Sequence, residues 1–314
     1  KVNLCPDGLV SDYYLGKDKY QKFLGIYSRN REEWLISSFG SQMNSIIIVT
    51  LYDTLGMNSI EFIINQTELH TIVIENKNIS KILELKNQNK IPNLKNLVCL
   101  NSHEDKPNEF EEIIKKCESI GLRIINYEDL INTGKKCVDE SDIEIINKNY
   151  NRAKPDSVYV ICYTSGTVGI PKGAMVTQHS LTLASNALYT IGYKLCEVDR
   201  IYSFLPLAHI MEQLIFQVCL TYGTQTGFTS GSLNRLLEDL QQLKPTYFCA
   251  VPRVYEKIYS GIIEKINEKG ALVKKLFETG LKVKINNYKK YGILTHPFYD
   301  TIFFNKTRNL LGGE

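Results

Sequence analysis

The sequence predicts an α/β protein with wound, mostly parallel sheets and flanking helices. From Arg31 onward, short apolar runs alternate with stretches whose apolar residues recur at helical spacing. That alternation is typical of parallel strands joined by crossover helices. The apolar runs are also rich in β-branched residues and nearly continuous in apolar character, as expected of strands covered on both faces.

The first part of the chain shows the strand and helix signals most clearly. Helices are expected where Ile60, Ile63 and Ile64 share a face, and again where Phe110 and Cys117 do. The helices lie between successive strands, so the strands are expected to pair in parallel. The expected strands are 45–51, 71–75, 96–100 and 123–127, and the expected helices are 59–65 and 109–120.

A polar stretch at 132–155 is rich in Lys, Asn and Asp and has no sustained period, which predicts a surface connection. We therefore expect a first α/β subdomain with this connection at 1–153 and a second α/β subdomain at 154–314.

The second part begins with an apolar strand, a glycine-rich loop and another short strand. Thr177 then predicts a helix cap, because Leu181, Ala184, Leu188 and Ile191 recur on one helical face after it. The expected elements are strands 157–163, 173–176 and 246–251, the loop 164–172, helices 233–243 and 254–266, and a Lys-rich, solvated helical stretch to 305.

Composition excludes several classes of protein. The 314 residues include 37 Lys and Arg against 34 Asp and Glu, and this near balance argues against a nucleic-acid partner. The longest apolar runs fall far short of the roughly 20 residues needed to cross a bilayer, and no signal peptide is expected. The eight cysteines are scattered without a CxxC pair, which favours a reducing compartment.

The loop 164–173, TSGTVGIPKG, combines the groups that bind phosphate oxygens. Its glycines let amide groups converge on an anion, its hydroxyls donate hydrogen bonds, and Lys172 supplies a cation. The alternative is a solvated turn between strands. A Walker A loop is disfavoured, because Pro171 and Gly173 flank the lysine in place of Gly and Ser or Thr.

This loop, preceded by an apolar strand, resembles the phosphate-binding signature of the adenylate-forming superfamily of acyl-CoA synthetases, luciferases and peptide-synthetase adenylation domains. Other segments resemble the long-chain fatty-acyl-CoA synthetases: 27–34 (YSRNREEW), 51–56 (LYDTLG), 204–212 (FLPLAHIME) and 251–257 (VPRVYEK). The resemblance implies the incomplete large N-terminal domain of an adenylate-forming enzyme.

The resemblance also implies a two-step ligation that uses ATP, Mg²⁺ and CoA. A fatty-acid carboxylate attacks the α-phosphate, pyrophosphate leaves, and the CoA thiol takes the acyl group. His209 would border the acyl pocket, and the Thr164 hydroxyl would also bind Mg²⁺. The residues implied to hold the β- and γ-phosphates are Thr164, Ser165, Gly166, Thr167, Gly169 and Lys172.

Other residues of the resembling segments are interpreted as structural. Arg29, Asn30, Arg31 and Trp34 are expected to form the scaffold around a helix start. Glu212 and Arg253 are also assigned structural roles, as ion-pair or cap partners.

Departures from the family pattern limit what the chain is expected to do. Val168 stands where the family usually has Thr, which removes one hydroxyl donor. The main catalytic lysine, the Mg²⁺-binding glutamate and the C-terminal catalytic domain are expected to lie outside these residues, so the fragment is expected to be inactive alone. A non-catalytic nucleotide- or acyl-binding homologue, or a CoA ligase for another class of acid, remains an alternative.

Because acyl-CoA is amphiphilic, peripheral attachment to the cytoplasmic side of the endoplasmic reticulum or another membrane is expected.

Overall fold

The computed structural model divides the chain into two compact units. The first has the bounds Lys1–Lys194 and Leu205–Val218, and the second Leu195–Phe204 and Cys219–Glu314. The residues that the structure describes are 11–14, 20–100, 107–137, 153–164, 171–192, 194–230 and 235–313. The boundary expected between 153 and 154 stays a prediction.

The first unit is built on a mostly parallel sheet, as predicted. Its order is β6-β5-β4-β2-β3-β7-β8, and β1 pairs with β2. The pairs from β6 to β7 are parallel, whereas β8 and β1 are antiparallel to their neighbours. The strands are β1 (Ser11–Tyr14), β2 (Tyr20–Tyr27), β3 (Ile46–Leu51), β4 (Thr71–Glu75), β5 (Asn96–Leu100), β6 (Arg123–Asn126), β7 (Val158–Thr164) and β8 (Lys172–Thr177).

The predicted strands agree closely with the observed ones. β4 and β5 have the predicted bounds, and every residue of β3, β4 and β5 is buried, as the continuous apolar runs indicated. β6 ends one residue earlier than predicted, because Tyr127 already begins a helix.

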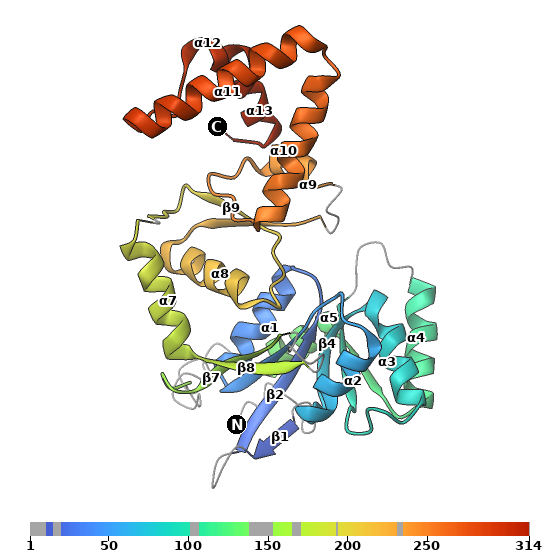
Figure 1. Ribbon diagram of the computed structural model, residues 1–314. Coiled ribbons are helices and arrows are strands. Elements are labelled where there is room, and N and C mark those ends of the chain that lie inside the picture. Colours follow the sequence, from blue (N-terminus) through green and yellow to red (C-terminus); the bar gives the residue numbers. More distant parts are fainter. Residues whose placement is uncertain are drawn as a thin grey trace. The chain divides into compact units, whose positions relative to one another are not determined.

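Helices cover both faces of this sheet. Buried side chains of α2, α3 and α4 join one apolar core with β3, β4 and β5, and Figure 1 shows these three helices on the same side of the sheet. The connection through α1 runs in the other direction, which puts α1 on the opposite face. The helices are α1 (Glu32–Gln42), α2 (Met57–Gln66), α3 (Asn76–Asn87), α4 (Pro107–Ser119), α5 (Tyr127–Cys137), α7 (Gln178–Thr190) and α8 (Ile210–Tyr222), the last of which continues into the second unit.

Two details of the first unit correct the sequence analysis. Residues 132–137, predicted to begin a surface connection, lie in α5, where Tyr127 and Leu130 are buried or half-buried. Ile191, predicted to share the apolar face of the following helix, lies beyond α7 and is 71% exposed. The cap prediction is confirmed, since the Thr177 hydroxyl accepts the Ser180 amide at 3.1 Å.

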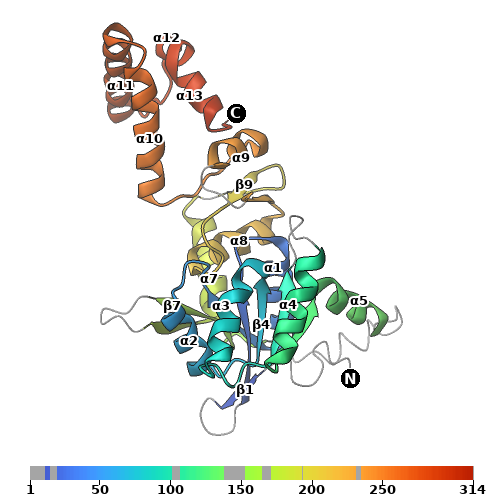
Figure 2. The same cartoon turned by 90° about the vertical axis from the view of Figure 1, so that its right-hand side faces the viewer.

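The second unit has a short parallel sheet followed by helices. β9 (Arg200–Ser203) pairs with β10 (Gln225–Phe228). The helical elements are α9 (Leu236–Leu243), α10 (Pro252–Asn267), α11 (Ala271–Tyr291), α12 (Pro297–Tyr299), a π-helical turn at Asp300–Phe304 and α13 (Asn305–Leu310). In Figure 2, α10 is followed by α11, and α12 and α13 then lead to the C-terminus. The predicted solvated helical stretch is therefore confirmed as helical.

The strand predicted at 246–251 is wrong. In the described residues, this segment contributes only an isolated parallel bridge between Tyr247 and Ile201. The amides of Thr246 and Tyr247 both donate to the carbonyl oxygen of Arg200, so the ladder does not continue along the segment. Phe248 instead packs in a small apolar cluster, where it stacks on Phe204 at 5.5 Å, whereas Cys249 and Val251 are exposed. Apolar character here reflects side-chain packing without strand pairing.

No helix within the described ranges is both long enough and apolar enough to cross a membrane.

Candidate functional site

The β7–β8 hairpin brings two of the predicted phosphate-binding residues together. β7 is buried from Tyr159 to Tyr163 and emerges at Thr164, which is exposed and pairs with Lys172 in the antiparallel register. The Thr164 hydroxyl points to the carbonyl oxygen of Lys172 at 3.5 Å. The hairpin therefore presents a hydroxyl and an ammonium group at one end of the sheet.

The rest of the predicted loop lies outside the described residues. Those positions are Ser165, Gly166, Thr167 and Gly169, and their roles stay predictions. In the part of the chain that the structure describes, Lys172 makes no ion pair, which leaves its charge available to an anion.

Close packing at the base of the hairpin explains one glycine. A Cβ on Gly173 would lie 2.8 Å from the Ile161 Cγ2 atom and 3.2 Å from the Tyr163 Cζ atom. Carbon atoms do not approach this closely without strain. Gly173 thus allows the exposed β8 to lie tightly against the buried β7.

His209 lies in a turn that leads into α8. Its amide donates to Pro206 O at 2.8 Å, and its Nδ1 accepts the Met211 amide at 3.2 Å. Because Nδ1 is an acceptor, this hydrogen bond assigns the proton of the neutral ring to Nε2. The side chain is exposed, so Nε2 can donate a hydrogen bond to a ligand.

Glu212 and Arg253 both lie in the first turn of a helix, but one is buried and the other is exposed. Glu212 is buried in the first turn of α8, and its amide donates to His209 O at 3.2 Å. Arg253 is exposed in the first turn of α10 and has no partner among the described residues. The structural role predicted for Arg253 through a carboxylate partner therefore has no support in these contacts.

Thr50 connects the hairpin region with the segment before His209. Its buried hydroxyl lies 3.0 Å from Ala208 O and 3.4 Å from Ile161 O of β7. Within the described ranges, no hydrogen bond or ion pair joins His209 directly to Thr164 or Lys172. β3 is thus the shared neighbour of both predicted site regions.

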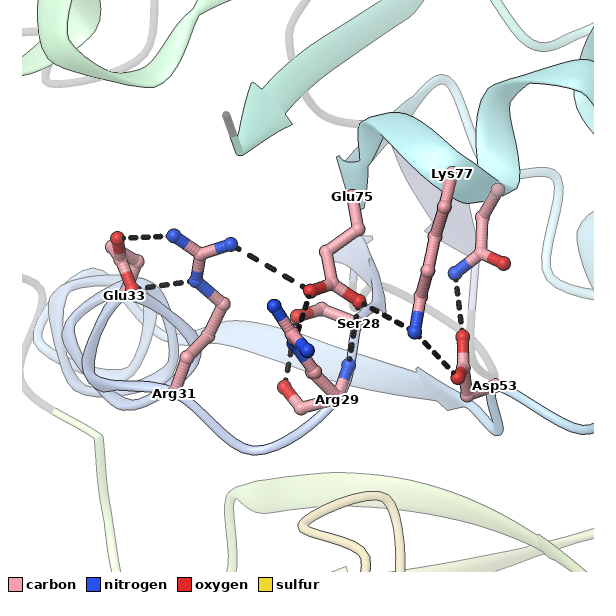
Figure 3. Close-up of polar contacts among 8 residues, drawn as sticks. Ser28, Arg29, Arg31, Glu33, Asp53, Glu75 and Lys77 are labelled. Carbon is pink, nitrogen blue, oxygen red and sulfur yellow. Dashed lines mark hydrogen bonds and ion pairs between the residues drawn. The ribbon is translucent and has the colours of Figure 1, made fainter. Parts of the chain in front are cut away.

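A charged network lies beyond the carboxyl ends of β2 and β4 (Figure 3). Glu75, 3% exposed, accepts from Arg29 Nε at 2.8 Å and lies 3.3 Å from Lys77 Nζ and 3.7 Å from Arg31 Nη1. β3 and β4 flank β2 on opposite sides, and such a reversal of strand order is where open α/β sheets bind ligands.

The outer members of this network balance its charge. Arg31 also pairs with Glu33 at 2.6 Å, and Lys77 pairs with Asp53 at 2.8 Å. Burial opposes ionisation of Asp53, but hydrogen bonds from Lys77 and Asn78 outweigh it and hold the pKa of this carboxyl below its usual value. Each cation of the network is thus paired with a carboxylate of the same network, which agrees with the structural role predicted for Arg29 and Arg31.

Sequence reasoning missed Glu75 and Thr50 altogether and gave Asn30 only a scaffold role. Glu75 ends a continuous apolar strand, and an acidic residue at that position was the one signal that could have indicated a buried ion pair. Thr50 and Asn30 act through contacts with residues more than 150 positions away, which leave no periodic pattern.

The described residues contain no group of three or more His, Cys, Asp or Glu side chains arranged to hold a metal ion.

Comparison with known protein families covers most of the chain. A family model described as AMP-binding enzyme matches residues 15–289. Long chain acyl-CoA synthetase 5 of Arabidopsis thaliana is 34% identical over 296 residues, covering 92% of this chain and 42% of the relative. Long-chain-fatty-acid–CoA ligase 6 of Mus musculus is 30% identical over 310 residues, covering 94% and 40%. The chain thus spans about two-fifths of the length of the curated relatives it matches.

Solved structures with the same fold include adenylation domains. The adenylation domain of a carboxylate reductase from Mycobacterium chelonae matches with a TM-score of 0.69 at 17% identity, over 92% of this chain and 45% of that chain. The A-PCP didomain of a carboxylic acid reductase from Segniliparus rugosus, in complex with AMP, matches with a TM-score of 0.65 at 17% identity, over 93% and 41%. At these identities the likeness establishes the fold, and it confirms the predicted fold class.

Proposed function

Because this chain belongs to the AMP-binding enzyme family, we propose that the protein it forms part of activates a long-chain fatty acid with ATP and transfers the acyl group to CoA. The acid's carboxylate oxygen attacks the α-phosphorus, and the bond to pyrophosphate breaks. The CoA thiol then attacks the acyl carbon, and AMP leaves. The fatty-acid substrate is suggested by the names of the plant and mouse relatives. The sequence identity of about 30–34% to these relatives supports the proposal of a fatty-acid substrate.

The observation that supports nucleotide binding most strongly is the β7–β8 hairpin. The register pairs Thr164 with Lys172, so the two ends of the glycine-rich loop are held side by side. The loop sequence between these two residues supplies hydroxyls and glycine amides suited to an anion, and the Lys172 charge adds to them. In this proposal Thr164, Lys172 and the loop between them hold the β- and γ-phosphates.

Mg²⁺ is proposed to enter with ATP. It keeps several waters and prefers phosphate oxygens, so the exposed Thr164 hydroxyl is proposed as one ligand at the hairpin, in addition to the Mg²⁺-binding glutamate expected outside these residues. His209 is proposed to border the fatty-acid pocket and to donate through Nε2 to the carboxylate or adenylate.

The test is acid-dependent pyrophosphate release from ATP by the longest natural form of the protein, scanned over fatty acids of several lengths and one aromatic acid. Lys172→Ala is expected to lower kcat/KM about a hundredfold, because a preorganised cationic donor at developing phosphate charge is worth that much. Gly166→Ala is expected to impair release as well, because glycine is the residue type that best lets backbone amides approach an anion closely.

The matched control is Lys154→Ala, an exposed lysine shortly before β7. It is expected to leave pyrophosphate release unchanged. ATP binding without release on any acid would instead favour a non-catalytic nucleotide-binding homologue, and release on the aromatic acid alone would favour a ligase for another acid class. We also expect these 314 residues alone not to complete the reaction.

Peripheral membrane association on the cytoplasmic side is proposed as well, with the endoplasmic reticulum or another membrane as its site. The support is α11, which carries six lysines against one glutamate. Lys275, Lys282 and Lys289 are exposed and recur every seven residues, so they lie along one face, opposite the buried Phe277 and Gly280. Co-sedimentation with phosphatidylserine vesicles, lost when these three lysines become Gln, is the expected result; equal binding by both forms would contradict it.

A further inference from the structure

A buried asparagine joins the carboxyl end of β2 to the segment that precedes His209. Asn30 is 5% exposed. Its Nδ2 donates to Leu205 O at 2.6 Å, and its Oδ1 accepts the Leu207 amide at 2.7 Å. The two partners bracket Pro206, so one amide group satisfies the backbone on either side of a residue that has no N–H of its own.

Two more buried side chains hold the same segment. Gln213 Nε2 donates to Leu207 O at 2.7 Å, and the Thr50 hydroxyl donates to Ala208 O at 3.0 Å. Asn30, Thr50 and Gln213 are all nearly inaccessible to water, so their hydrogen bonds are not readily exchanged for bonds to solvent. The backbone at 205–208 is therefore fixed by polar contacts from β3, from the end of β2 and from α8.

The position of His209 follows from this fixed segment. His209 comes directly after Ala208, its amide donates to Pro206 O, and its ring is held by the Met211 amide. A shift of Leu205 or Leu207 would therefore move the backbone of His209 and, with it, the imidazole ring.

We propose that Asn30 is a positioning residue for the acyl site, which acts by fixing the 205–208 backbone and hence His209. The inference rests on the proposed function, in which His209 borders the fatty-acid pocket. Asn suits this position because the end of its side chain carries both an NH₂ group, which donates, and a carbonyl oxygen, which accepts. Asp keeps the acceptor but sets an oxygen against Leu205 O, and Ala leaves both backbone groups unpaired in a buried site.

The kinetic test compares Asn30→Asp and Asn30→Ala with a matched control, Asn65→Asp. Asn65 also donates to a backbone oxygen, that of Lys90 at 2.8 Å, but at an exposed place on α2. Both Asn30 variants are expected to raise the KM for the fatty acid about tenfold, with the KM for ATP within about twofold of its original value. The control should change neither. A parallel rise of both KM values would show that the effect is not confined to the acyl site and would overturn the positioning role.

A double-mutant cycle tests whether Asn30 acts through His209. In a His209→Ala background, Asn30→Asp is expected to have a much smaller effect on the fatty-acid KM than in the original protein, because the group that it positions is gone. Fully additive effects would contradict the proposal.

Hydrogen exchange gives a readout that does not depend on activity. Peptides covering 205–213 should exchange faster in Asn30→Asp than in Asn65→Asp, since the Leu205 contact is lost. Unchanged exchange would overturn the proposed fixation of the segment. If exchange rises as expected but no fatty acid supports pyrophosphate release in the original protein, the proposed function fails, and the positioning role falls with it.

Discussion

Glu75→Gln tests the charged network at the end of β4 without changing the size of the side chain. The substitution removes the anion on which Arg29, Arg31 and Lys77 converge, while Gln can still accept the Arg29 amide, which lies 3.2 Å from Glu75 Oε2. Breaking a fully buried ion pair by removing one partner costs about 3–5 kcal/mol.

The magnitude expected here is smaller. The Arg29 and Lys77 side chains are 36% and 48% exposed, so water can partly solvate the cations that Glu75 leaves behind. We therefore expect Glu75→Gln to lower the free energy of unfolding by about 2 kcal/mol. Urea denaturation at neutral pH, followed by circular dichroism, measures this change.

The matched control is Glu61→Gln. Glu61 lies 3.4 Å from Lys90, but both side chains are substantially exposed, so removing this pair should cost only about 0–1 kcal/mol. Equal urea midpoints for the two variants would refute the conclusion that burial makes Glu75 the structural centre of the network.

Three other expectations follow from local contacts. Burial raises the pKa of the Cys162 thiol to about 11, so iodoacetamide at pH 8 should label the exposed Cys196 and spare Cys162 in peptide maps. Burial disfavours the Asp300 carboxylate, but the Lys284 and His296 contacts outweigh burial and lower the pKa of this carboxyl in the folded protein. The carboxylate therefore stabilises the fold fully above the unfolded pKa of about 4, and this stabilisation is lost as the pH falls through the lower pKa of the folded state. Asp300→Asn should thus shift the urea midpoint at pH 7 and much less at pH 2. Gly173→Ala should cost about 1 kcal/mol, from a 2.8 Å contact with a β7 methyl, whereas Gly40→Ala, which meets open space within α1, should not lower thermal stability.

Much of the first unit could be predicted from the sequence because its central strands β3, β4 and β5 are buried at every residue. Continuous apolar runs such as 71–75 and 96–100 have no other common explanation at that length. The helices expected at 59–65 and 109–120 are also observed, as α2 and α4, and their bounds extend one to two residues further at some ends, whereas α3 (Asn76–Asn87) was not predicted. Cap and terminal residues make few core contacts, so the apolar period does not mark them.

The second unit was harder to predict because its apolar residues do not follow one rule. The run at 246–251 reads as a strand, yet among the described residues it pairs with β9 at a single bridge. Its aromatic ring at Phe248 packs against Phe204 and Tyr255 instead. Periodicity reports burial on a face, and it does not report whether a neighbouring strand is present to complete a ladder.

The candidate site was predicted only in part. The hairpin joining Thr164 to Lys172 follows from two strands around a glycine-rich loop, whereas the Asn30 contacts join residues 175 and 177 positions apart. Such pairings depend on the completed fold, and the residue type gives no sign of them. The roles of the loop residues and of His209 stay predictions.

The most direct measurement follows an oxygen isotope through the first step of the reaction. The longest natural form of the protein would receive ATP, CoA and a long-chain fatty acid labelled with ¹⁸O in its carboxylate. Attack of that carboxylate on the α-phosphorus predicts AMP that carries one ¹⁸O atom, with unlabelled pyrophosphate. Labelled inorganic phosphate together with ADP, and no labelled AMP, would place the attack at the γ-phosphate and contradict the account.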